Sequence, residues 1–286
     1  MIKDKRGLEM EVIVRYIYIT VGFLIILLIA GNFAGDIFPK TLSIETCRGS
    51  VFLRGAALEK TALAELIIPS LKCKTEYRCL TKGEKCSPGY EKVPVKGESQ
   101  VKKEIADAMY NCWFQLGEGS VDFIGKKFRR ESSCVICSRI IFDEAVREEV
   151  KTIDDFRKYL ADTKAPNGQS YLQYISNNPK VKVEGTDQII DLSKEYAVVY
   201  SIYTGEYFLS LVAGALPGAT TGAVIGSYVG PIGTIVGGTI GGISGILWVE
   251  DIKKGDPKEQ LVYSIQLTEF TAENIAKSCS TIESLI

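Results

Sequence analysis

The chain has 286 residues and a formal net charge of −1, so its overall charge gives no reason to expect a nucleic-acid partner. It contains no histidine, which excludes Ser-His-Asp and Cys-His catalysis and any metal site that needs an imidazole ligand. Two long stretches without Asp, Glu, Lys or Arg interrupt a chain that is otherwise rich in charge, a pattern typical of a membrane protein with a water-facing part.

The first charge-free stretch, "YIYITVGFLIILLIAGNFAG", covers residues 16–35. As a helix of 20 residues it would be about 30 Å long, which matches the hydrocarbon core of a bilayer. We therefore predict a transmembrane signal anchor at 16–35. The basic residues in 1–15 favour a cytoplasmic N-terminus. A cleaved signal peptide is the alternative, but the exit from the stretch lacks a small-x-small cleavage pattern.

All eight cysteines follow this segment, and their number is even. On the predicted topology they lie outside the cytoplasm, where disulfides form and persist. Every cysteine is therefore a disulfide candidate, although the sequence does not give the pairing. The candidates are Cys47, Cys73, Cys79, Cys86, Cys112, Cys134, Cys137 and Cys279.

Residues 36–206 are predicted to form this extracytoplasmic cysteine-rich α+β domain. Periodic apolar residues predict helices at 55–67 and from Ser99 to a stop at Gly117, with Cys112 on the buried face of the second. Two further short helices are expected in 152–179, the first capped by Thr152.

Cys134 and Cys137 form the single CxxC motif, in "SSCVICSRIIF". A redox dithiol opens a helix after a strand, whereas this motif continues into a strand-like segment, so structural disulfides are favoured over an oxidoreductase or half of a zinc site. Carboxylates such as Glu118 and Asp122 could serve acid–base catalysis, but a solvated turn is the favoured interpretation of this pair.

The second charge-free stretch lies in residues 207–249 and contains glycine at every fourth position. With Pro231 as the turn, it predicts a helical hairpin of two membrane spans, Phe208 to Gly230 and Ile232 to Val249. Each glycine would cost about 1 kcal/mol against alanine in a soluble helix, but in lipid a glycine groove lets helices pack closely. The packing glycines are Gly214, Gly218, Gly222, Gly226 and Gly230, then Gly233, Gly237, Gly241 and Gly245. The alternatives are a glycine-rich hairpin buried within the domain or an oligomer, and a glycine-rich disordered loop.

These two series resemble the glycine-zipper hairpins of two-pass membrane proteins, over residues 214–245. The rest of the chain resembles uncharacterised archaeal membrane-anchored cysteine-rich proteins. The resemblance implies helix packing or homo-oligomerisation within the bilayer and specifies no activity.

Two similar segments, "YAVVYSIYTG" and "QLVYSIQLTE", flank the hairpin and predict a pair of antiparallel strands. Residues 250–286 would thus return to the domain as a strand and a helix capped by Thr271, with Cys279 bonded back. The expected fold is a disulfide-stapled α+β domain with an N-terminal transmembrane helix and a glycine-zipper helical hairpin inserted between two strands.

The expected function is that of a membrane-anchored envelope protein of structural or interaction type, with the lipid bilayer as partner. The sequence offers no catalytic constellation, metal site or cofactor site. A pore-forming or membrane-remodelling protein is the first alternative, and a CxxC thiol-disulfide oxidoreductase is the second.

Overall fold

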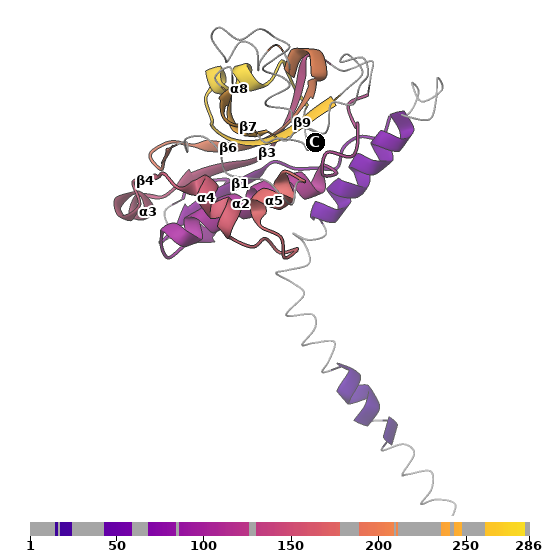
Figure 1. The fold of residues 1–286 in the computed structure, drawn as a ribbon. Helices are drawn as coiled ribbons and strands as arrows, with labels where there is room; N and C mark the ends of the chain where they lie inside the picture. The colour runs from indigo at the N-terminus through magenta and orange to yellow at the C-terminus, as the bar shows by residue number, and fades with distance from the viewer. Residues whose placement is uncertain are drawn as a thin grey trace, which may run out of the picture. The chain divides into compact units, whose positions relative to one another are not determined.

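The structure is a computed structural model, shown in Figure 1. It describes residues 15–16, 18–24, 43–58, 68–83, 86–125, 130–177, 189–208, 210, 236–240, 243–247 and 261–283. The chain divides into two units, Met1–Glu45 and Thr46–Ile286.

Helical backbone is found at 15–16 and 18–24 in the first unit. Most of the predicted anchor, residues 16–35, lies outside the described residues. Among the helices that are described, none combines the length and apolar character needed to cross a membrane.

An eight-stranded mixed sheet forms the centre of the second unit, in the order β2-β1-β3-β6-β9-β8-β7, with β10 also paired to β3. The β1–β2, β1–β3 and β10–β3 pairs are parallel, and the pairs from β3 through β6, β9 and β8 to β7 are antiparallel. The strands are β1 (Glu76–Thr81), β2 (Glu91–Pro94), β3 (Ser132–Phe142), β6 (Tyr196–Thr204), β7 (Val236–Ile240), β8 (Ile243–Leu247), β9 (Leu261–Glu269) and β10 (Thr281–Ile282). A separate antiparallel pair consists of β4 (Thr152–Ile153) and β5 (Ile190–Asp191).

The predicted pairing of the two similar segments is confirmed, because β6 and β9 are antiparallel neighbours along their full length. Their shared Val-Tyr-Ser-Ile sequences lie opposite each other, with Ser201 facing Ser264 and Ile202 facing Tyr263. The two segments have similar sequences because both form central strands that are buried on both faces.

The helices of the second unit are α2 (Glu98–Gln115), α3 (Glu144–Glu149), α4 (Phe156–Asp162), α5 (Tyr171–Ile175) and α8 (Ala272–Ser278), besides helical residues 46–58, 205–208 and 210. Figure 1 shows α2, α4 and α5 on one side of the sheet and α8 on the other. The core between α2 and the sheet contains the fully buried Trp113, whose ring centroid lies 5.6 Å from that of Tyr200.

Most of the helix predictions in this unit are confirmed. The apolar stripe predicted for α2 is buried, and α4, α5 and the Thr271-capped α8 are present. Two predicted caps are wrong: α2 begins at Glu98 after Gly97 without a side-chain cap, and Thr152 lies in β4 while Asp155 precedes α4.

The prediction of a second helix in the glycine hairpin is wrong at every residue of that helix that the structure describes. Residues 236–240 and 243–247 form β7 and β8, which pair with each other, and Ile246 and Leu247 of β8 pair with Ile265 and Ser264 of β9. The physical reason is that glycine disfavours helix while β-branched residues between the glycines favour strand, and β9 offers an edge to pair with.

Gly237 and Gly245 are thus strand residues and do not form a helix groove. The other predicted packing glycines and the predicted turn proline lie outside the described part of the chain: Gly214, Gly218, Gly222, Gly226, Gly230, Pro231, Gly233 and Gly241.

Candidate interaction surface

All eight cysteines are paired, so the prediction of a disulfide-stabilised domain is confirmed. The Cys134–Cys279 bond is the expected link from the last helix back to the domain, across a sequence separation of 145. The other pairs are Cys47–Cys73, Cys79–Cys86 and Cys112–Cys137.

The two cysteines of the CxxC motif belong to different disulfides. Cys134 lies in register with Ser201 on the face covered by α8, where it bonds to Cys279. A register shift between Ile136 and Ser138 marks a bulge, and Cys137 at this bulge joins the opposite core and bonds to α2. One strand therefore fastens a helix to each face of the sheet, and the motif does not form the internal disulfide that a CxxC oxidoreductase uses.

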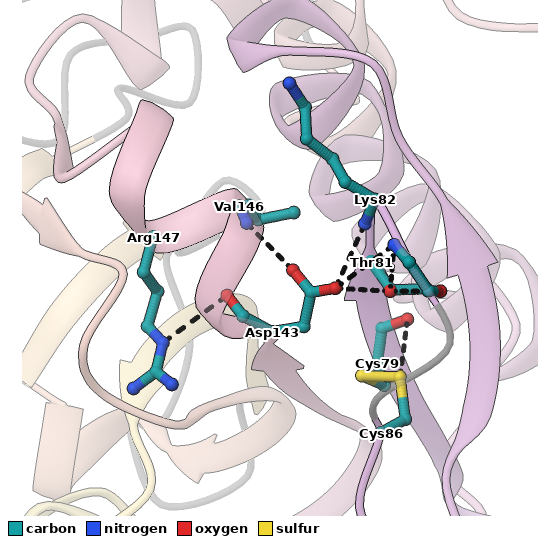
Figure 2. Close-up of a disulfide and its surroundings, with 8 residues drawn as sticks. Cys79, Thr81, Lys82, Cys86, Asp143, Val146 and Arg147 are labelled. Atoms are coloured by element: carbon teal, nitrogen blue, oxygen red, sulfur yellow. Dashed lines mark hydrogen bonds between the residues drawn. A yellow bond between two sulfur atoms is a disulfide. The ribbon is translucent and has the colours of Figure 1, made fainter.

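Asp143 connects the end of β1, beside the Cys79–Cys86 disulfide, to the start of α3 (Figure 2). Its Oδ1 accepts a hydrogen bond from the backbone N–H of Val146 at 2.8 Å. Its Oδ2 accepts from the Thr81 hydroxyl and, at 3.1 and 3.3 Å, from the backbone N–H groups of the next two residues. Burial raises the pKa of this carboxyl, but the four hydrogen bonds outweigh burial and hold the pKa below its ordinary value. Asp143 is therefore a structural carboxylate.

The acidic turn singled out in the sequence begins where α2 ends. Gly117 and Glu118 both adopt left-handed backbone, with φ of 85° and 56°. Their N–H groups donate to the carbonyls of Phe114 and Trp113 at 3.3 and 3.0 Å, the bond pattern of a Schellman motif. The predicted stop at Gly117 is confirmed.

Glu118 is engaged on both carboxylate oxygens. Arg48 donates to one at 2.9 Å and the Tyr174 hydroxyl donates to the other at 2.5 Å. Burial and this hydrogen bond raise the pKa of Tyr174. Asp122, in contrast, accepts from the backbone N–H groups of Ile124 and Gly125 through Oδ1. Because each carboxylate has partners of its own, the turn orders the chain and offers no paired acid and base.

A different group of side chains has the character of an interaction surface. We name it the Arg139 cluster, and it consists of Tyr77, Tyr90, Arg139, Glu195 and Phe270. The guanidinium carbon of Arg139 lies 4.0 Å from the ring centroid of Phe270 and 5.4 Å from that of Tyr77. Tyr77 and Tyr90 meet edge to face with centroids 5.5 Å apart.

Glu195 holds this arrangement together. Its Oε1 accepts a hydrogen bond from Nε of Arg139 at 2.7 Å and from the Tyr90 hydroxyl at 2.9 Å. The hydrogen bond to Glu195 raises the pKa of Arg139, and burial together with Glu195 raises that of Tyr90. The guanidinium is thus fixed as a cation, while Tyr77 keeps 42% of its surface exposed.

The cluster lies where the face of the sheet covered by α8 continues beyond that helix. Arg139 is in register with Tyr77 on β1 and with Ala197 on β6, and Ala197 is buried in the small core around α8. The cluster could not be predicted from the sequence, because its members come from five separate places in the chain. The one local signal was an arginine within the apolar segment that became β3.

Within the residues that the structure describes, no group of three or more His, Cys, Asp or Glu side chains could hold a metal ion. Comparisons with family models, with curated proteins and with solved structures find no match to this chain.

Proposed function

We propose that this chain is a membrane-anchored extracytoplasmic protein of structural or interaction type, and that its disulfide-stabilised domain acts by binding through the Arg139 cluster. The observation that carries the proposal is the pairing of all eight cysteines, because four disulfides need an oxidising compartment to form and persist. The charge-free residues 16–35 precede every cysteine and have the length of a bilayer span.

The Arg139 cluster has the composition of an interface centre. Tyr and Arg are enriched among residues that dominate binding energy, because each presents a large contact area whose geometry can be fixed in advance. Here Phe270 and Glu195 hold Arg139 in place before any partner arrives, so little side-chain entropy remains to be lost on binding.

Cysteine alkylation in intact cells tests the compartment. We expect all eight cysteines of the full chain to resist a membrane-permeant alkylating reagent until a reductant is added, and the protein to remain with membranes after a carbonate wash. Free thiols in cells at the paired positions would contradict the extracytoplasmic assignment, and release by carbonate would contradict the anchor.

Photo-cross-linking tests the surface. A photoreactive residue in place of Tyr77 is expected to give one discrete adduct in cells, and Arg139→Ala is expected to abolish it. A photoreactive residue at the exposed Lys158 on α4 serves as the control. Equal labelling at both positions would show that the Arg139 cluster is an ordinary surface.

A further inference from the structure

The helix of residues 43–58 carries an apolar stripe on its outward side. Gly49, Phe52, Leu53 and Ala56 are all exposed and follow the i, i+3, i+4, i+7 spacing of one helix face. Phe52 and Leu53 keep 41% and 67% of their surfaces exposed. Among the described residues of the second unit, they are the only adjacent pair of large exposed apolar side chains.

The opposite side of this helix is firmly docked. Cys47 and Val51 are buried, and Cys47 is bonded to Cys73. A Cβ added at Gly55 would meet Val121 at 2.4 Å, so the helix backbone lies directly against the domain there. The outward stripe is therefore presented in a fixed orientation.

The position of the helix in the chain indicates what covers the stripe. Only residues 36–42 separate it from the charge-free segment, and they reach at most about 25 Å when fully extended. Phe52 comes nine residues into the helix, or about 14 Å along its axis. If residues 16–35 are in a bilayer, this short tether allows the stripe to reach the bilayer surface.

The chemistry of the stripe fits a lipid interface. An aromatic and a branched aliphatic side chain project together, as on helices that lie in the headgroup region. Arg48 lies beside them with its guanidinium carbon 5.3 Å from the Phe52 ring centroid. The Arg48 guanidinium donates to the Glu118 carboxylate and to the Phe114 carbonyl, so it fastens this part of the helix to the end of α2.

We propose that the stripe Gly49–Phe52–Leu53–Ala56 docks on the outer surface of the bilayer and fixes the orientation of the domain relative to the membrane. This proposal rests on the anchor in the proposed function. The occupant is the lipid interface, and a second copy of the chain is the competing occupant that the experiment distinguishes.

Tryptophan quenching by brominated lipid tests the contact. The full chain with Trp248→Phe is reconstituted into vesicles of phosphatidylcholine and phosphatidylglycerol, with and without bromine on the acyl chains. Trp113 is fully buried and gives a constant background. Phe52→Trp is compared with Ile189→Trp, because Ile189 is 61% exposed and lies just before β5, far from Phe52 in the sequence.

We expect brominated lipid to quench the Phe52→Trp emission at least twofold more than the Ile189→Trp emission, with a blue shift at Phe52→Trp alone. Equal quenching in protein that floats with the vesicles would overturn the stripe contact and leave the anchor intact. A blue shift that depends on protein concentration and occurs without quenching would overturn the lipid contact and show that a second copy of the chain covers the stripe. Failure to float would overturn the anchor itself, and this proposal with it.

Discussion

At the residue scale, Asp143 links β1 to α3 through four hydrogen bonds to one carboxylate (Figure 2). We expect Asp143→Asn to lower the free energy of unfolding at pH 7 by about 1–3 kcal/mol, because Asn carries no charge and cannot accept on both sides. The exposed Asp154→Asn is the control. Denaturant titrations of the three proteins measure the difference.

The same carboxylate predicts a pH dependence. Its folded pKa is lowered, so its stabilising contribution is present above the unfolded pKa of about 3.9 and is lost as the pH falls through the folded value. The gap in stability between the natural protein and Asp143→Asn should therefore shrink as the pH falls below about 4. A gap that stays constant down to pH 2 would show that Asp143 does not titrate as inferred.

Two glycines with the same backbone conformation allow the stability cost of backbone strain to be measured apart from the cost of steric crowding. Gly89 and Gly117 have φ of 87° and 85°, but a Cβ at Gly89 meets nothing within 4 Å, whereas at Gly117 it comes within 3.1 Å of Val121. Gly89→Ala should cost about 1 kcal/mol from backbone strain alone, and Gly117→Ala should cost more. Thermal unfolding of both variants measures their losses of stability. Equal losses would show that contact with Val121 adds no cost at Gly117.

At the element scale, β3 fastens α2 and α8 through cysteines on its two faces. Loop-closure entropy predicts that removing Cys134–Cys279 costs up to about 5 kcal/mol, against about 2–3 kcal/mol for the short Cys79–Cys86 loop. We expect Cys134→Ser/Cys279→Ser to lower the unfolding midpoint well below that of Cys79→Ser/Cys86→Ser. The reverse order would show that packing at these sites outweighs chain entropy.

The β7–β8 pairing makes a second prediction at this scale. Gly238 and Gly245 are direct partners in the hairpin, whereas in one continuous helix seven residues would separate them by about two turns. Gly238→Cys/Gly245→Cys should therefore cross-link on mild oxidation, as read by mass mapping. Gly241→Cys/Gly245→Cys is the matched pair, because helix would bring those two positions together. Cross-linking of the second pair alone would restore the helical hairpin.

At the scale of the whole molecule, the long segment between β6 and β9 begins and ends at adjacent positions of the sheet, and its β7 and β8 extend the sheet beyond β9. Thr204 and Leu261 are paired at the adjoining ends of β6 and β9. A two-residue Asn-Gly turn in place of 205–260 should therefore close a hairpin and leave the four disulfides in place. Non-reducing mass mapping and circular dichroism check this outcome. Scrambled disulfides would show that the insertion is needed to fold the domain.

The sequence alone predicted features that local chemistry or simple periodicity determines. The apolar stripe and glycine stop of α2, the Thr271 cap, and the strand character of the Val-Tyr-Ser-Ile segments depend on neighbouring residues. The even number of cysteines after a charge-free segment likewise predicted disulfides. The anchor at 16–35 remains a prediction from length and absence of charge.

Only the tertiary structure decided which cysteines pair, because pairing depends on a bulge in β3 that delivers Cys137 to one face while Cys134 stays on the other. It also decided between helix and strand at Gly237 and Gly245. Glycine spacing is compatible with a packing groove in lipid, but the free edge of β9 stabilises a strand, and pairing partners distant in sequence are invisible to a local pattern. The Arg139 cluster exists for the same reason, since only the assembled sheet brings its five side chains together.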